Sequence, residues 1–291
     1  MTPRRLRTAL ASTLCATALL SALPGCEPPP PARGFVPRHE KPDEADRDNA
    51  DLLERRGLVE LVTADLNAYL DVPHRITVVA RSCGGEGSGY DPETRRIELC
   101  YDDLTEDRRR FEEADRHPAD EPLSDVVRET LHHEAGHALI DALDLPVRDR
   151  GRAEEDAADR FAQLMLLRAP EGDRALLTAA RAYDLAAAAD PSPDPDDEHA
   201  PDPARAESHR CAAYGAAPAR HPDLATPARA HCARTWTATR DTWTADLTPL
   251  LRKGAVVSMA FGTVQPSMLP GGTTHSVGWP VREAIMSKSP S

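Results

Sequence analysis

The residues best suited to chemistry form one short run, His133-Glu134-Ala135-Gly136-His137. Two histidines four positions apart lie on the same side of an α-helix, so both imidazoles can bind one metal ion. A glutamate that follows the first histidine lies beside that ion, where it can take a proton from a water molecule. The run therefore predicts a Zn²⁺ site at His133 and His137, with Glu134 as the general base of a hydrolysis.

The surrounding sequence has the pattern of the helix that such a site requires. Over residues 124–143 apolar residues recur at intervals near four, and Ser124 is a suitable N-cap. Gly136 is unfavourable inside a helix but permits the close approach of another backbone. This context favours a true site over a chance match, which a chain with eleven histidines also allows.

A catalytic zinc site needs a third protein ligand and one open position. The best candidate is Glu155, at the start of a second predicted helix over residues 153–167. Glu154 also falls on the apolar face of that helix and competes for the role, whereas Asp156 points to solvent. Asp159, one turn further on, can accept a hydrogen bond from a ligand histidine and fix its tautomer. The alternative is an acidic first turn favoured only by the helix dipole.

The elements around these two helices predict a mainly helical α+β fold. Two short strands with β-rich or alternating residues are expected before the motif, at 76–80 and 96–101. The other helical patterns cover residues 51–70, 173–189, 203–213 and 227–251. The expected order is a small hairpin or sheet, then the helix with the motif, then further helices.

Composition divides the chain into a domain and flanking segments. We expect the folded domain at residues 50–251, interrupted by an acidic, proline-rich insertion at about 190–203. Residues 26–49 carry four consecutive prolines and many charges, and they are expected to form a disordered tether. Residues 252–291 are rich in Gly, Pro, Ser and Thr and are expected to form a disordered tail.

The first 25 residues have the features of a signal peptide. A positive head with three arginines is followed by an apolar run over residues 9–23. The string Leu23-Pro24-Gly25-Cys26 resembles a bacterial lipobox, which implies cleavage before Cys26 and lipidation of that cysteine. We therefore expect an outward-facing membrane lipoprotein, or a secreted protein if the signal is an ordinary one.

The cysteine count agrees with export. Once Cys15 leaves with the signal and Cys26 carries lipid, an even number remains in the domain. These four are Cys83, Cys100, Cys211 and Cys232. In an oxidising compartment they suggest two disulfides, and pairing neighbours in the sequence is the simplest of three arrangements. Zinc binding by cysteine is the weaker alternative, because no CxxC pair occurs.

Net charge and composition exclude one class of partner. The formal net charge is −13, so nucleic acid is disfavoured. Aromatic residues make up only 4% of the chain, which leaves Leu, Val and Ala to form the core, in keeping with helices.

The two helical motifs together resemble the gluzincin pattern, HExxH followed by ExxxD, here at His133–His137 and Glu155–Asp159. Shorter segments over about residues 52–251 are similar to a family of exported bacterial metallopeptidases. They are Tyr90-Asp91-Pro92-Glu93-Thr94, Leu99-Cys100-Tyr101, Asp197-Glu198-His199, Cys211 and Tyr214-Gly215. This resemblance implies a zincin-like architecture, with the strand at 96–101 as an edge that binds an extended peptide.

These observations predict a zinc-dependent peptidase acting on peptides or proteins of the cell envelope or outside the cell. A further group should stabilise the oxyanion of the reaction. The possible donors are His199, Tyr101, Tyr183 and His209, and His199 is interpreted as an exposed linker residue. The rival function is a non-catalytic module in which a structural zinc supports binding to an envelope partner. The presence of Glu134 argues against it, because a structural site needs no general base.

Overall fold

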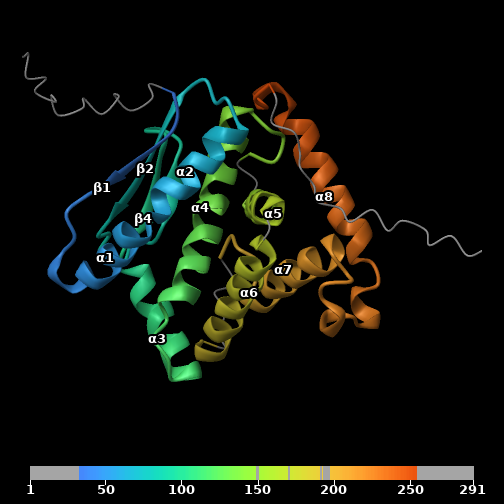
Figure 1. The fold of residues 1–291 in the computed structure, drawn as a ribbon. Helices are drawn as coiled ribbons and strands as arrows, with labels where there is room; N and C mark the ends of the chain where they lie inside the picture. Colours follow the sequence, from blue (N-terminus) through green and yellow to red (C-terminus); the bar gives the residue numbers. More distant parts are fainter. Residues whose placement is uncertain (1–32, 149–150, 170, 191, 193–196, 254–291) are drawn as a thin grey trace, which may run out of the picture. The chain divides into compact units, whose positions relative to one another are not determined.

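The computed structural model describes residues 33–148, 151–169, 171–190, 192 and 197–253. Its helices and strands, in chain order, are β1 (Gly34–His39), α1 (Arg47–Arg56), α2 (Leu58–Tyr69), β2 (Arg75–Arg81), β3 (Gly89–Asp91), β4 (Arg96–Cys100), α3 (Asp103–Asp115), α4 (Asp120–Ala142), α5 (Arg152–Arg168), α6 (Gly172–Ala189), α7 (Asp202–Ala216) and α8 (Cys232–Leu247). The predicted α+β fold, mainly helical with a small sheet, is confirmed (Figure 1). Among the described residues, no helix combines the length and the apolar character that crossing a bilayer requires.

The four strands form one sheet in the order β1-β2-β4-β3. β1, β2 and β4 are mutually parallel, and β3 runs antiparallel to β4. The expectation that the strand at 96–101 is an edge is therefore wrong, because β4 is paired on both sides. The edge strands are β1 and, beside β4, β3, whose three residues are too few to show the alternation that marks a strand in a sequence.

The larger part of the expected tether, from residue 34 onward, belongs to the folded domain. β1 lies alongside β2, and Phe35 and Val36 are buried in the core. Asn67 of α2 accepts a hydrogen bond from the backbone N–H of Phe35 and donates one to its carbonyl, at 2.9 and 2.7 Å. The prediction of a disordered tether over 26–49 is thus wrong from residue 34 onward. Two apolar residues among charges are enough to form a strand here, because a strand distant in the sequence pairs with them.

Helix α4 lies between the sheet and the helices α5 and α6 (Figure 1). Leu131, Ala135 and Leu139 are buried along it. A Cβ atom placed on Gly136 would lie 2.9 Å from the Cα atom of Ala158 on α5. The absence of a side chain at Gly136 therefore allows the two helix backbones to touch, as the sequence suggested.

Both predicted disulfides are present. Cys83 is bonded to Cys100, and Cys211 to Cys232. The first bond closes the loop between β2 and β4, and the second joins α7 to the start of α8.

Most of the remaining expectations for the flanking segments concern residues that the structure does not describe. The signal peptide, Cys26 and nearly all of the predicted tail at 252–291 lie outside the described residues. Of the predicted insertion at 190–203, residues 197–201 are described as a loop, and α7 begins at Asp202.

Candidate metal centre

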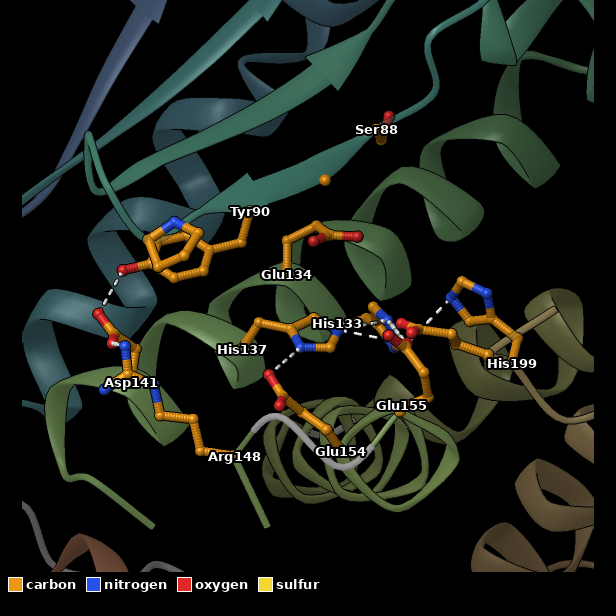
Figure 2. A pocket seen from close by; sticks show the side chains of 14 residues that line it. Ser88, Tyr90, His133, Glu134, His137, Asp141, Arg148, Glu154, Glu155 and His199 are labelled. Atoms are coloured by element: carbon orange, nitrogen blue, oxygen red, sulfur yellow. Dashed lines mark hydrogen bonds and ion pairs between the residues drawn. The ribbon is translucent and has the colours of Figure 1, made fainter. Parts of the chain in front are cut away.

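Three side-chain atoms from α4 and α5 converge at the wall of a cavity of about 540 Å³ (Figure 2). The Nε2 atoms of His133 and His137 are 3.2 Å apart, and Oε2 of Glu155 lies 3.1 and 3.3 Å from them. In a tetrahedral zinc site with bonds of about 2.0–2.1 Å, neighbouring ligand atoms are about 3.3 Å apart. The three atoms thus have the spacing of one face of a zinc coordination tetrahedron.

The other ring nitrogen of each histidine is held by a carboxylate. Nδ1 of His133 lies 2.8 Å from Oδ1 of Asp159, and Nδ1 of His137 lies 3.1 Å from Oε1 of Glu154. A hydrogen bond from Nδ1–H to a carboxylate leaves the Nε2 lone pair facing the cavity, as a metal requires. Glu154, the competing ligand candidate in the sequence, therefore contacts Nδ1 of His137, whereas Glu155 contacts Nε2 (Figure 2).

The electrostatics of the cluster favour positive charge at its centre. Burial alone would lower the pKa of His133, but the carboxylates of Asp159 and Glu155 outweigh it and raise the pKa to about 10. Burial would raise the pKa of Glu155, but hydrogen bonds from the surrounding imidazoles hold it well below its usual range. A divalent cation supplies the same positive charge that protons otherwise provide.

Glu134 lies in the same cavity without such support. Burial raises the pKa of its carboxyl group above the ordinary value, against the opposing effect of His133 and His137. Among the described residues, none forms a hydrogen bond or an ion pair with its carboxylate. Glu134 is therefore free to exchange a proton with a molecule in the cavity.

His199 lies beside Glu155, although the sequence suggested an exposed linker residue. Its Nε2 atom is 2.9 Å from Oε2 of Glu155, and its side chain is only 40% exposed. Nδ1 lies 3.1 Å from Oδ1 of Asp197, which also accepts a hydrogen bond from the backbone N–H of His199. Arg152 binds the carbonyl oxygens of Asp197 and Glu198 and fixes this loop. The spacing of Asp197 and His199 was the available signal, since an aspartate two residues away can orient an imidazole.

Of the other three possible oxyanion donors, Tyr183 lines an adjoining cavity of about 360 Å³, and Tyr101 and His209 line neither cavity. Tyr101 is buried and donates a hydrogen bond to the carbonyl of Glu40. His209 and Tyr183 both contact the buried carboxylate of Glu129, at 2.9 and 3.3 Å. Of the four, only His199 lines the 540 Å³ cavity.

Arg205 binds Asp159, the carboxylate that holds His133, and the sequence did not indicate this role. Its guanidinium donates to both carboxylate oxygens of Asp159, at 3.0 and 2.6 Å, and stacks on the ring of Tyr183. Burial would raise the pKa of Asp159, but His133 and Arg205 hold it well below its usual range. The contact joins α7 to α5, and no local sequence pattern reveals a pair 46 residues apart.

Comparison with known proteins gives one match. A family model described as "Putative metallopeptidase" (DUF4344) matches residues 39–247. No curated protein and no solved structure matches the chain.

Proposed function

Because the chain belongs to this family of metallopeptidases, we propose that it is a zinc-dependent peptidase whose general base is Glu134. The observation that carries the proposal is the ligand triangle of His133, His137 and Glu155 beside an unpartnered carboxylate. Two imidazoles and one carboxylate form a ligand set that zinc accepts in hydrolases, with the fourth position open. Family membership implies a metal cofactor, and this donor set favours zinc.

A bound zinc ion would supply a Lewis acid that polarises the scissile carbonyl and makes water more acidic. Glu134 takes the proton of the attacking water and later delivers it to the leaving amine. Burial raises the pKa of Glu134, which makes its carboxylate a stronger base for the first of these steps. His199, oriented by Asp197, faces the same cavity and is the donor best placed to stabilise the oxyanion.

The substrate would be a peptide or protein segment in an extended conformation. β3 pairs with β4 on one side only, and Ser88, Gly89 and Tyr90 line the cavity. A free strand edge offers backbone N–H and C=O groups to an extended chain. The edge therefore lies where a peptide bond could be presented to Glu134.

We also propose that the protein is exported and anchored to the membrane through lipid at Cys26. The two disulfides support export, because such bonds persist in oxidising compartments. Replacing Cys26 by alanine should release the protein from the membrane fraction into the soluble fraction. If Cys26→Ala partitions like the wild type in membrane fractionation, the anchor is elsewhere or absent.

The direct test measures metal content and peptide cleavage together. The purified protein, loaded with zinc, should bind about one ion and cleave members of a peptide library, and a chelator should abolish cleavage. Zinc binding without turnover would support the structural module that binds an envelope partner. No zinc binding would show that the HExxH run has no metal function.

A further inference from the structure

We propose that this enzyme cleaves internal peptide bonds, with about three substrate residues bound on each side of the cleavage point. The inference rests on the proposed peptidase function and names its substrate class. It derives from cavities that extend in both directions from the catalytic residues.

Two cavities meet at the metal centre. The first, of about 540 Å³, extends past His137 to Asp141 near the end of α4. The second, of about 360 Å³, extends the other way along α4 to Glu129 and Val126. Both are lined by the same four residues, Ser88, His133, Glu134 and His199. The catalytic glutamate is therefore in the middle of a continuous run of lining residues, not at its end.

The rise per residue of helix α4 gives the length of the two cavities on each side of Glu134. With a rise of about 1.5 Å per residue, Val126 lies about 12 Å before Glu134 along the axis, and Asp141 about 10 Å after it. An extended chain advances about 3.3 Å per residue, so each side accommodates about three residues. The edge strand follows the same direction, since Gly87 lines the second cavity and Pro92 the first.

The arginines that line the two cavities and could hold a free carboxylate have partners within the protein, whereas the carboxylates of Glu198 and Asp202 form no ion pair with the described residues. Arg148, in the first cavity, forms an ion pair of 2.7 Å with Asp141. In the second cavity Glu129 is bound to His209, and Asp107 pairs with Arg110 at 3.2 Å. An exopeptidase needs a charge that captures the free amine or carboxylate close to the catalytic group. Pairing of the arginines disfavours capture of a free C-terminus, and the cavities on both sides of Glu134 favour passage of the substrate chain in both directions.

The second cavity has a wall of small residues that leaves room for a peptide. Ala179, Ala182 and Ala186 of α6 line it. Ala186 is half-buried, so a larger side chain there would enter the cavity more easily than it would disturb the core. This position can be used to close one side of the cleft.

The first experiment uses the zinc-loaded full chain and decapeptides that are N-acetylated and C-amidated, with cleavage sites assigned by mass spectrometry. We expect cleavage at internal bonds, with kcat/KM rising as residues are added up to about three on each side. Cleavage only of peptides with a free terminus, or only of terminal bonds, would overturn this inference and leave the peptidase function intact. If no peptide of either kind is cleaved, both proposals fail.

The second experiment compares Ala186→Phe with Ala188→Phe, an exposed position on the same helix that does not line the cavity. Ala186→Phe should lower kcat/KM by about tenfold for peptides long on one side and leave peptides truncated on that side unaffected. Ala188→Phe should behave as wild type. Zinc content and Tm establish that each variant is folded and loaded. Equal loss in Ala186→Phe for long and truncated peptides would exclude the second cavity as a binding site.

Discussion

The proposed metal ligands, His133 and His137 on α4 and Glu155 on α5, lie beside the proposed general base Glu134, but they are held very differently. His133, His137 and Glu155 each contact two or more charged or imidazole groups. Glu134, equally enclosed, has no hydrogen bond or ion pair within the described part of the chain. Fixed ligands reduce the cost of arranging a metal site, whereas a carboxylate without a protein partner remains available to a water molecule in the cavity. Substitutions on the two sides should therefore separate metal binding from turnover.

The largest effect is expected from removing a ligand. His137→Ala and Glu155→Ala should lose both stoichiometric zinc and all measurable cleavage, because two remaining ligands do not hold the ion. Metal analysis after dialysis, together with a peptide assay, checks this. If Glu154→Ala loses zinc while Glu155→Ala retains it, the assignment of the third ligand is wrong.

Removing the base should affect turnover alone. Glu134→Gln should keep zinc and the Tm of the wild type but lower kcat by about 10²–10⁴, the usual contribution of general acid–base catalysis. Its matched control is His137→Ala, which loses both properties. Cleavage by Glu134→Gln at the wild-type rate would remove Glu134 from the mechanism.

A smaller effect is expected at the carboxylate behind His133. Asp159→Asn should weaken zinc affinity by about 10–100-fold, since the amide accepts a weaker hydrogen bond from the imidazole. Asp156→Asn, on the exposed side of the same helix, is the control and should bind zinc as the wild type does. Competition with a chelator of known affinity measures both. Equal affinities in the two variants would assign Asp159 a role in folding only.

The smallest effect is expected at Arg205, which contacts Asp159 and not the proposed metal ligands' cavity-facing atoms. Arg205→Met leaves Asp159 with fewer hydrogen bonds and should weaken zinc affinity by up to about tenfold. Arg205→Lys should restore part of it, because the charge remains but the two-point contact does not. Arg210 lies on α7, as Arg205 does, and forms an ion pair with Asp184 of α6, so Arg210→Met serves as the control. A Co²⁺-substituted enzyme whose absorption spectrum is unchanged in Arg205→Met would rule out a positioning role.

The parts of this site that depend on local spacing could be predicted from the sequence. His133, His137 and Glu155 follow from helical periodicity, and the position of Asp159 follows from one further turn. The mainly helical fold was predictable for the same reason, because long amphipathic patterns are strong signals. The disulfide pairing followed from parity and proximity along the chain.

The parts that depend on distant contacts were missed. β1 is stabilised by pairing with β2 across about forty residues, and its composition resembles a tether. β3 is too short to show a period. His199 and Arg205 reach the site because the chain returns as α7, and neither neighbours the motif in the sequence. Such side chains become visible only when the tertiary contacts are known.

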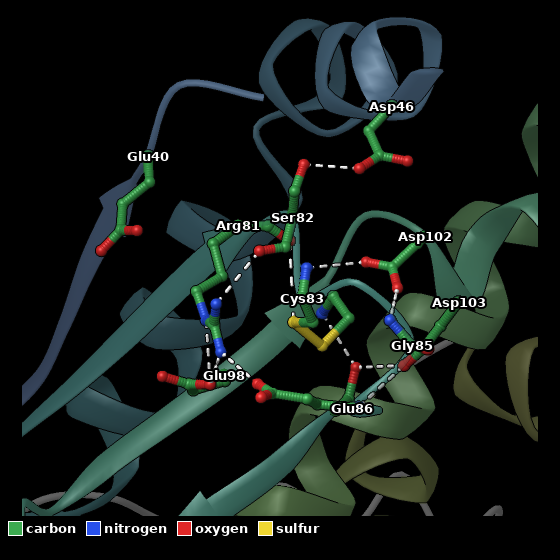
Figure 3. The surroundings of a disulfide bond; sticks show 12 residues. Glu40, Asp46, Arg81, Ser82, Cys83, Gly85, Glu86, Glu98, Asp102 and Asp103 are labelled. Atoms are coloured by element: carbon green, nitrogen blue, oxygen red, sulfur yellow. Dashed lines mark hydrogen bonds and ion pairs between the residues drawn. A yellow bond between two sulfur atoms is a disulfide. The ribbon is translucent and has the colours of Figure 1, made fainter. Parts of the chain in front are cut away.

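The loop before the edge strand has a consequence for the thermodynamics of substrate binding. The Cys83–Cys100 bond closes this loop, and Asp102 accepts hydrogen bonds from the backbone N–H groups of Cys83 and Gly85 (Figure 3). Asp103 in turn binds the N–H and hydroxyl of Ser88, directly before β3. Ordering a flexible segment of this kind typically costs about 1–2 kcal/mol of backbone entropy per residue. Here that entropy is lost when the protein folds, so a peptide that joins the edge meets a strand already in its bound conformation and keeps more of its interaction energy as affinity.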